Sequence, residues 1–433
     1  NCIRNTTTDE YAGVIAEEIT DPRPYCEIIR QWSTFHPEFA FLPRKFKIAV
    51  NAVPGADRAA IQIHDIGVNL VRNDAGEIGY RILVGGGLGR TPIIGEEIRS
   101  FLPEEDLLTY LDAIIRVYNQ FGRRDNKYKA RIKILTKALG IERMRELVEA
   151  EWERTRHSDG KLTQAELDRV KKHFTDPAYL ELADEPAELS AARAENAAFA
   201  RWLGRNVRKH KKAGYAVVTL TLKQKGTPPG DITSEQLEQI AALADQYSFG
   251  EIRSTHQQNL VLADVEQREL FNLWQQAKAL GLATPTLGLL TDMICCPGGD
   301  FCALANAKSI PVAEAIQVRF DDLDYLYDLG EIDLNISGCM NACGHHHVGN
   351  IGILGVDKKG EEFFQISLGG NAGEESTLGK ILGPSFAREQ IPDIIAKILD
   401  FYVAKRQEGE SFLETYRRIG HDPFKEAIYG PAH

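Results

Sequence analysis

The sequence lacks long hydrophobic stretches and any excess of basic residues. Over its 433 residues, no apolar run approaches the ~18–20 residues that a membrane-spanning helix needs. Lys and Arg number 51 against 62 Asp and Glu, which gives a formal net charge of −11. This balance argues against a general nucleic-acid-binding protein, yet it is compatible with a local basic pocket for an anionic ligand. The 26% of charged and 43% of hydrophobic residues indicate a globular chain of two to four domains.

Cysteine is also scarce, and its distribution is uneven. Of the seven cysteines, five fall within the 49 residues from Cys295 to Cys343. A secreted disulfide framework would place an even number of cysteines in a short chain. The odd count and the clustering in a long chain instead predict a cytoplasmic protein whose cysteines bind a metal or a cluster.

The spacing of the clustered cysteines narrows the kind of site. Cys296 and Cys302 form one pair, and Cys339 and Cys343 form a second pair after 36 intervening residues. Four thiolates in two pairs suit a [4Fe–4S] cluster or a structural zinc ion. Zinc sites prefer shorter, tighter pairs, although His345 to His347 could add zinc ligands. The neighbouring glycines favour the cluster, because they let backbone N–H groups approach sulfur closely.

These cysteine segments carry a resemblance to a known family. Together with Leu42–Lys47, Leu83–Leu88 and Gln258–Leu260, they resemble the assimilatory sulfite and nitrite reductase hemoproteins, most closely the beta component of sulfite reductase. The resemblance implies two cofactors, siroheme and a [4Fe–4S] cluster. It implies four cluster ligands, the last of which is also the axial thiolate of the siroheme iron: Cys296, Cys302, Cys339 and Cys343.

A basic segment predicts where an anion binds. Arg44-Lys45-Phe46-Lys47 leads into an expected strand at 48–52, on which Lys45 and Lys47 point to the same face. An edge strand kept soluble by lysine is the alternative. By resemblance, Arg4, Lys45 and Lys47 are catalytic and face the open site on the siroheme iron.

Further residues are assigned to the cofactors. By resemblance, Arg44, Asn259 and Cys343 bind siroheme. A second basic run at 123–133 is expected to reach the siroheme carboxylates or the electron donor, or to form a solvated helix face. The glycine-rich stretch at 85–89 fails the dinucleotide-binding fingerprint because Arg90 stands at the third glycine position, so no NADPH site is implied.

The chain also repeats itself. Asp65-Ile-Gly-Val68 matches Asn350-Ile-Gly-Ile353, and a glycine-rich loop follows each copy at the same offset of 284–285 residues. Before the second copy, a β-α-β-β-α pattern predicts a ferredoxin-like half-module. No such unit precedes the first copy, so we expect an upstream half-module to be missing from this sequence.

The predicted fold is α+β: a duplicated sulfite and nitrite reductase repeat of mixed sheets flanked by helices, with a ferredoxin-like half-module. The expected divisions are a first reductase repeat at 1–150, a helical linker at 151–210, the half-module at 211–283, a second repeat carrying the cluster cysteines at 284–400 and a helical tail at 401–433, thought to be one surface helix.

The predicted function is the six-electron reduction of sulfite to sulfide in sulfur assimilation. Reduction of nitrite to ammonia is the alternative within the family, and a non-catalytic iron–sulfur or zinc protein is the alternative outside it. Since no flavin or NADPH motif is present, a partner protein must deliver the electrons, either a ferredoxin or a flavoprotein reductase. No nucleic-acid or membrane partner is expected.

Overall fold

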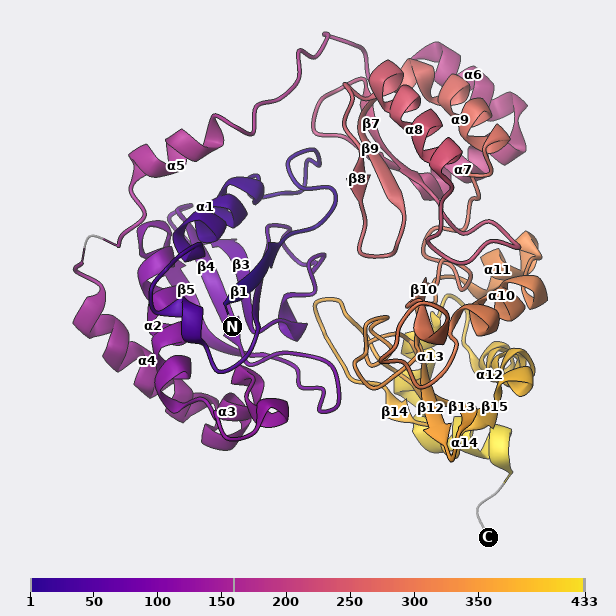
Figure 1. The fold of residues 1–433 in the computed structure, drawn as a ribbon. Coiled ribbons are helices and arrows are strands. Elements are labelled where there is room, and N and C mark those ends of the chain that lie inside the picture. Colours follow the sequence, from indigo (N-terminus) through magenta and orange to yellow (C-terminus); the bar gives the residue numbers. More distant parts are fainter. Residues whose placement is uncertain (1, 159, 431–433) are drawn as a thin grey trace. The chain divides into compact units, whose positions relative to one another are not determined.

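The fold is described from a computed structural model, which covers residues 2–158 and 160–430. The chain forms two compact units, coloured along the sequence in Figure 1, and each is described by itself. Unit 1 comprises Asn1–Tyr179 and Ala372–Ser376, and unit 2 comprises Leu180–Asn371 and Thr377–His433. Among the described residues, no helix is both long enough and apolar enough to cross a membrane.

Unit 1 is built on a five-stranded mixed sheet in the order β1-β2-β3-β4-β5. The first three strands are parallel and the last two pairings are antiparallel. The strands are β1 (Ile3–Thr7), β2 (Phe46–Asn51), β3 (Ile66–Arg72), β4 (Ile78–Val84) and β5 (Glu96–Pro103). The helices are α1 (Arg23–Ser33), α2 (Leu107–Phe121), α3 (Ile132–Leu139), α4 (Ile141–Thr155) and α5 (Gln164–Lys171), with short 3-10 turns η1 (Phe39–Phe41), η2 (Ile61–Ile63), η3 (Glu104–Asp106) and η4 (Lys127–Lys129).

The hydrophobic core of unit 1 lies between its sheet and the helix α2. Strand β2 lies between two parallel neighbours, and Phe46, Ile48 and Val50 on it are fully buried. They share one core with the apolar face of α2, which the helical spacing in the sequence predicts. Residues 104–121, whose apolar side chains recur at helical spacing, form the 3-10 turn η3 followed by α2.

Unit 2 contains a second mixed sheet in the order β10-β11-β12-β13-β14, with β15 also paired to β13. Its strands are β10 (Ile294–Cys295), β11 (Leu334–Ser337), β12 (Ile351–Lys358), β13 (Glu361–Leu368), β14 (Lys380–Ile381) and β15 (Phe386–Ala387). The helices around it are α10 (Ile310–Arg319), α11 (Leu323–Leu329), α12 (Ile391–Lys405), α13 (Phe412–Ile419) and α14 (His421–Tyr429), with the turns η6 (Gly298–Asp300) and η7 (Arg388–Gln390).

The two mixed sheets are copies of one another, as the sequence repeat predicts. In each, two parallel pairings are followed by antiparallel ones. The backbone oxygen of Asp65 accepts the N–H of Gly85 at 3.0 Å, and that of Asn350 accepts the N–H of Gly369 at 3.0 Å. The fold-class prediction of a duplicated repeat is therefore confirmed.

Unit 2 also contains the ferredoxin-like half-module. Its antiparallel sheet has the order β6-β7-β9-β8. The elements are β6 (Val207–Lys209), β7 (Tyr215–Leu220), α8 (Ser234–Tyr247), β8 (Arg253–Ser254), β9 (Leu260–Glu266), the turn η5 (Gln267–Glu269) and α9 (Leu270–Ala279), preceded by α6 (Ala187–Glu195) and α7 (Ala197–Asn206). The predicted β-α-β-β-α order is confirmed, and Gly250, with a φ of +77°, forms a turn before β8.

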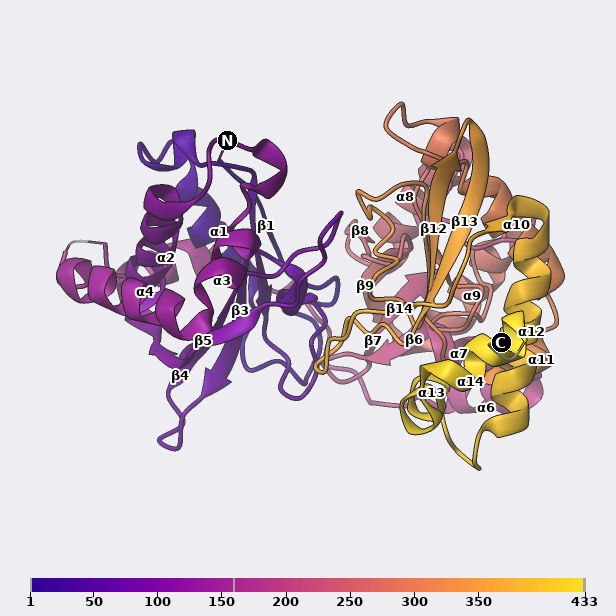
Figure 2. The same cartoon turned by 90° about the horizontal axis from the view of Figure 1, so that it is seen from below.

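The C-terminal segment differs from the single surface helix expected from the sequence. It forms two helices, α13 and α14, which lie beside α12 in Figure 2. Phe412 and Phe424 on them are fully buried in the core of unit 2. The segment is thus part of the packed unit, because each helix presents an aromatic residue to α12.

Candidate functional site

The first cysteine pair lies at the end of the edge strand β10. Cys295 is the last residue of β10 and is buried, and burial raises the pKa of its thiol. Cys296 follows it; its N–H donates to the backbone oxygen of Ile336 at 3.1 Å, so it continues alongside β11. Its sulfur accepts the N–H of Gly338 at 3.0 Å and lies 3.5 Å from the hydroxyl of Ser309. A sulfur that accepts hydrogen bonds is the better ligand, which favours Cys296 over Cys295.

The two cysteine loops meet at Gly338, the residue before Cys339. The backbone oxygen of Gly338 accepts N–H groups of Asn306 at 2.8 Å and Ala307 at 3.1 Å. A Cβ atom added to Gly338 would come within 2.8 Å of the Gly298 Cα atom and 2.7 Å of the Ala307 oxygen. Glycine is required here because the segment of the second cysteine pair passes directly against the loop of the first.

The second pair lies on a tight turn. Cys339 is buried and Cys343 is exposed. Ala342 and His345, on either side of Cys343 and Gly344, have φ values of +57° and +56°. Non-glycine residues adopt this left-handed conformation at a cost, and such residues concentrate at functional sites. The turn therefore presents Cys343 outward on a strained loop.

The arrangement fits a [4Fe–4S] cluster. None of the four cysteines forms a disulfide. An amide N–H aimed at a ligand sulfur, a glycine crossing and an outward thiol are features that such clusters use. Within residues 2–158 and 160–430, no group of three or more His, Cys, Asp or Glu side chains is drawn together around the position of a single ion. A four-iron cluster is wider than one ion and is held by sulfurs further apart.

A glutamine side chain also supports the first cysteine loop, a contact that the residue spacing did not predict. The Gln258 amide nitrogen donates to the Cys295 oxygen at 2.9 Å, and its oxygen accepts the Cys295 N–H at 2.8 Å. A neighbouring strand would supply the same pair of hydrogen bonds to the open edge of β10. The left-handed φ of +61° at Gln258 aims the side chain there. Gln258 thus fixes the backbone immediately before Cys296.

Asn259, which the resemblance assigns to siroheme, has protein partners within unit 2. It is buried; its amide nitrogen donates to Asp292 at 2.9 Å, and its oxygen accepts the N–H of Leu222 at 3.0 Å. Nearby, the buried Lys223 ammonium donates to the oxygens of Gln257 at 2.7 Å and Met293 at 3.0 Å. In these contacts Asn259 ties the half-module to the loop before the cysteines, so its assignment to siroheme rests on the resemblance alone.

The predicted basic residues lie together in unit 1. Arg4 is on β1, which runs parallel to β2, and the register pairs Asn5 with Lys47. Lys45 directly precedes β2 and is partly buried. Burial lowers the pKa of Lys45, and the nearby charges of Lys47, Arg131, Arg44 and Arg4 lower it further. The charges of the other four cations all reach Lys45, so the five residues form one cluster, here named the cationic cluster: Arg4, Arg44, Lys45, Lys47 and Arg131.

Most of the cationic cluster has no carboxylate partner. Among the described residues, no Asp or Glu forms an ion pair with Arg4, Arg44, Lys45 or Lys47, whereas Arg131 is paired with Asp65 at 2.7 Å. Positive charges gathered on a partly buried surface without acids repel one another unless an anion binds. The cluster therefore fits a polyanionic group such as siroheme and a small oxyanion.

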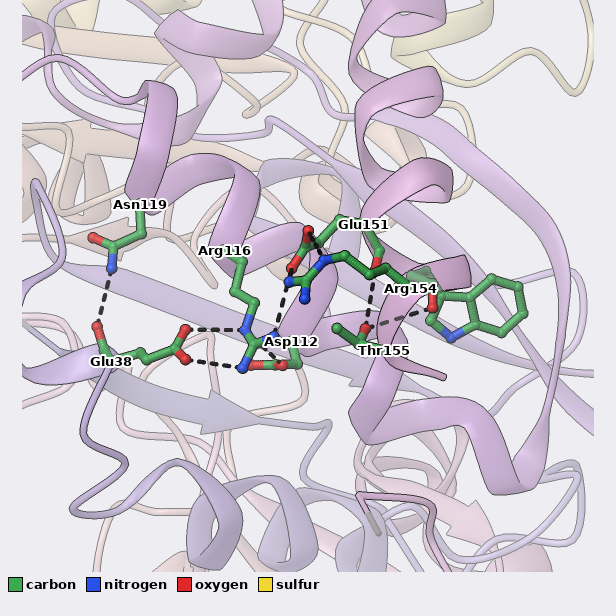
Figure 3. A network of polar contacts seen from close by, with 8 residues as sticks. Glu38, Asp112, Arg116, Asn119, Glu151, Arg154 and Thr155 are labelled. Atoms are coloured by element: carbon green, nitrogen blue, oxygen red, sulfur yellow. Dashed lines mark hydrogen bonds and ion pairs between the residues drawn. The ribbon is translucent and has the colours of Figure 1, made fainter. Parts of the chain in front are cut away.

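Arg116, a partly buried arginine in unit 1, shows the opposite arrangement (Figure 3). Arg116 on α2 contacts Glu38 at 2.8 Å, Asp112 at 3.0 Å and Glu151 at 3.5 Å. Its charge is more than matched, and burial raises the pKa of Asp112 to about 6. This network ties α2 to α4 and to the segment before η1, and it leaves no positive charge for a ligand.

The second basic run does not form one solvated helix face. Arg123 pairs with Asp125 on the surface at 2.5 Å. Arg131 and Lys133 turn inward instead: Lys133 is buried and donates to the oxygens of Leu88 and Thr91, each at 2.6 Å. Burial lowers the pKa of Lys133 to about 8. Arg131 and Lys133 therefore support the glycine-rich loop. Sequence spacing alone did not distinguish these two residues from the exposed ones of the same run.

The predicted site residues thus form two groups. The cluster cysteines and Asn259 are in unit 2, and Arg4, Arg44, Lys45 and Lys47 are in unit 1. The cysteines suit an iron–sulfur cluster, and the basic residues suit an anion. Gly338, Gln258 and Asp65 join them as residues to which the sequence assigned no role in the site; the available signals were the adjacency of Gly338 to Cys339, the place of Gln258 in a family-like segment and that of Asp65 in the repeat.

Comparison with known families covers most of the chain. Residues 1–156 and 289–432 match the family described as nitrite and sulphite reductase 4Fe-4S domain. Residues 208–280 match the nitrite/sulfite reductase ferredoxin-like half domain. The predicted cofactors, siroheme and a [4Fe–4S] cluster, are confirmed at the level of this family.

Individual relatives agree. The chain is 28% identical to sulfite reductase (ferredoxin) 1 of Mycolicibacterium paratuberculosis, covering 95% of this chain and 68% of that protein. It is 27% identical to the chloroplastic ferredoxin–nitrite reductase of Arabidopsis thaliana, covering 94% of this chain and 66% of that protein.

A solved structure shows the same fold. The Mycobacterium tuberculosis NirA protein superposes with a TM-score of 0.76 at 26% identity, over 98% of this chain and 72% of that one. The duplicated sheets, the half-module and the family matches lead to one conclusion: the chain belongs to the nitrite and sulfite reductase family of oxidoreductases.

Proposed function

We propose that this protein catalyses the six-electron reduction of sulfite to sulfide in sulfur assimilation. The observation that carries the proposal is the pair of cysteine loops joined at Gly338, in a chain whose relatives include ferredoxin-dependent sulfite reductases. The unpaired cations of the cationic cluster support an oxyanion substrate.

In this proposal the cysteines hold the cofactors. Cys296, Cys302, Cys339 and Cys343 would hold the [4Fe–4S] cluster, and the exposed Cys343 would also hold siroheme. Arg44 neutralises siroheme carboxylates, and Asn259 lines the siroheme site through the position of its loop. When bound, the two groups supply single electrons at an open iron site, which the protein itself has no side chain to provide.

The residues of the cationic cluster act on the substrate. Arg4, Lys45 and Lys47 bind its oxygens through charge-assisted hydrogen bonds and stabilise the negative charge. Because burial and neighbouring cations lower the pKa of Lys45, its ammonium Nζ releases a proton more readily than an exposed lysine does. Such protons are consumed as each substrate oxygen leaves as water.

We further propose that a ferredoxin delivers the electrons and that the enzyme works in the cytoplasm. Two of the similar relatives are named for ferredoxin, and the lack of disulfides among the described cysteines suits a reducing compartment. Exposed basic residues at 123–129 are a candidate docking surface for an acidic ferredoxin.

The test combines a visible spectrum with iron and acid-labile sulfide assays on one sample of purified protein. Heme-like bands with more iron than a four-iron cluster contains, and sulfite turnover with reduced ferredoxin, are the expected result. A cluster spectrum without heme bands would overturn the proposal. Turnover with nitrite but not with sulfite would instead establish the second candidate, which the ferredoxin–nitrite reductases among the relatives favour.

A further inference from the structure

Asp65, at the start of β3, is a fully buried carboxylate that links two parts of the cationic cluster. Its Oδ2 accepts the backbone N–H of Lys47 at 2.9 Å. Its Oδ1 accepts Nη2 of Arg131 at 2.7 Å and Nε at 3.1 Å. The side chain is only 1% exposed, so all of its charge is directed at these partners. One carboxylate therefore holds both the strand that carries Lys47 and the guanidinium beside Lys45.

The second repeat shows what the fold itself requires at this position. The strand registers pair Ile48 with Ile66 and Leu334 with Ile351, which makes Lys47 and Asp333 equivalent. There Asn350 takes the place of Asp65: its Oδ1 accepts the N–H of Asp333 at 2.9 Å. Its amide nitrogen donates to the oxygen of Gly370 at 3.0 Å.

In the second copy, a neutral amide thus accepts the backbone N–H of the neighbouring strand, so the repeat does not need a charge at this position. The first copy uses a carboxylate, and that carboxylate is paired with Arg131. The negative charge must therefore serve a purpose specific to the first copy, which is the copy that carries the cationic cluster.

Arg131 is held firmly on its other side as well. A Cβ atom on Gly87 would come within 2.7 Å of Nη2 of Arg131, so the glycine-rich loop packs directly against the guanidinium. Lys133, two residues later, fastens that loop by donating to the oxygens of Gly87 at 3.2 Å and Leu88 at 2.6 Å. Arg131 is 18% exposed, and its charge reaches Lys45.

We propose that Asp65 is a positioning residue of the anion site, whose charge fixes the Arg131 guanidinium beside Lys45 and Lys47. The inference rests on the proposed function, since it assigns the anion site to the substrate and to siroheme. Asp65 touches neither; it acts through Arg131 and through the strand that carries Lys47.

The test measures sulfite binding to the purified holoprotein by calorimetry, with the visible spectrum and thermal midpoint recorded on each variant. Asp65→Asn keeps an acceptor for the Lys47 N–H, as Asn350 does, but loses the charge that holds Arg131. We expect an unchanged midpoint and cofactor content, with the sulfite dissociation constant raised about tenfold or more. Arg131→Gln should give a similar loss, and the double variant should be no worse than Arg131→Gln alone.

Asp57→Asn is the matched control, because it removes another carboxylate of unit 1 that bonds only backbone N–H groups, of Ala59 and Ile61. It should leave sulfite binding unchanged. A dissociation constant for Asp65→Asn that stays within twofold of wild type or becomes smaller, or losses that add in the double variant, would overturn the inference. If Asp65→Asn does not fold, Arg131→Lys provides the test. It keeps the positive charge but loses the paired N–H groups that bond Asp65, so sulfite binding at the wild-type level would count against a positioning role for Asp65.

The two proposals fail separately. Sulfite binding that depends on Asp65 in a protein without heme bands would contradict the proposed function and keep this inference. Heme bands with sulfite binding indifferent to Asp65 would do the reverse, and a wild-type protein that binds no sulfite would contradict both.

Discussion

Basic side chains in unit 1 fall into two classes at the scale of single residues. Arg116 is surrounded by Glu38, Asp112 and Glu151, and its charge serves the packing of two helices. Among the described residues, the ammonium groups of Lys45 and Lys47 form no ion pair with an acid, and Lys45 has other cations as neighbours. The number of acids within reach, rather than burial, separates a structural cation from one available to an anion.

The sequence could identify the second class only in part. Lys45 and Lys47 were predicted from alternation on a strand, which needs no tertiary information. Arg131 and Lys133 could not be separated from the exposed Arg123, because whether a residue of a charged run points inward depends on the distant Asp65 and on the loop at Gly87.

Lys45→Met tests the first class. We expect the visible spectrum and iron content to be retained, because methionine preserves the apolar stem, while sulfite turnover falls about 100-fold with the loss of a charge beside the oxyanion. Lys137→Met, at an exposed lysine of the same unit outside the candidate docking surface, is the control and should leave turnover unchanged. Intact turnover in Lys45→Met would mean that the anion binds elsewhere.

His346 gives a pH-dependent prediction. It is 2% exposed, and within the described residues neither ring nitrogen has a hydrogen-bond partner. Burial, with smaller effects of His347 and His345, lowers its pKa to about 3. Because the unfolded imidazole binds protons near pH 6.5 and the folded one does not, stability is lost as the pH falls below 6.5.

The expected loss for this group is about 2 kcal/mol by pH 5. Urea unfolding of wild type and His346→Leu between pH 7 and pH 5 measures it: the variant should show the shallower decline. His256→Leu, at an exposed histidine, should match wild type. Parallel declines for wild type and His346→Leu would show that this ring is not the group responsible.

At the scale of elements, the spacing of apolar residues predicted the periodic helices and strands, but it did not predict features that depend on tertiary contacts. The helix over 107–121 and the half-module order followed from apolar spacing. The tail was thought to be one surface helix, whereas Phe412 and Phe424 each anchor a separate helix against α12. Short strands such as β10 have too few residues to show an alternation of apolar and polar side chains, and their partner strands lie far along the chain.

Gly338→Ala tests the crossing of the two cysteine loops. The new Cβ would clash with backbone atoms of Gly298 and Ala307, so the loops must separate and the N–H bond to the Cys296 sulfur must lengthen. We expect iron and acid-labile sulfide per chain to fall by half or more. Gly204→Ala, on a helix with open space around it, should retain both. Full cluster content in Gly338→Ala would show that the crossing does not constrain the ligands.

Gln258 tests the support of the edge strand. Gln258→Leu removes both bonds to the Cys295 backbone and leaves two buried polar groups unpaired, a cost of about 2–4 kcal/mol. The cluster should then be lost faster to a chelator, as followed by the decay of its visible absorption. Gln257→Leu, at the exposed neighbouring residue, serves as the control. Equal decay rates would leave Gln258 without a role in holding the cysteine loop.

At the scale of the whole molecule, the repeat was readable from sequence because its glycines recur at a constant offset. The positions of the basic residues in the first copy and of the cysteines in the second were also read from the sequence, whereas the role of Asp65 in the first copy needed the tertiary contacts. The domain boundaries inferred from composition, including a linker at 151–210, remain predictions.

Limited proteolysis tests that linker. Residues 172–179 follow α5 without regular structure and are largely exposed, whereas 180–185 are held by bonds to Tyr215 and Gln267. Trypsin should therefore cut first after Lys172, giving two fragments that terminal sequencing identifies. Replacing Lys171 and Lys172 with glutamine should suppress the cut. An earlier cut elsewhere would place the most accessible segment outside the predicted linker.

The meeting point at Gly338 has a consequence for the order of assembly. The first cysteine loop leaves β10 and the second leaves β11, and the chain between these parallel strands must first form α10 and α11. Parallel pairing between distant segments forms late in folding, since its loop must close before any contact rewards it. The thiols of the two pairs therefore come within reach of one another only in a nearly complete unit 2. Iron is expected to be delivered to a folded protein, and a chain that carries a full cluster has, by that fact, already passed its slowest folding step.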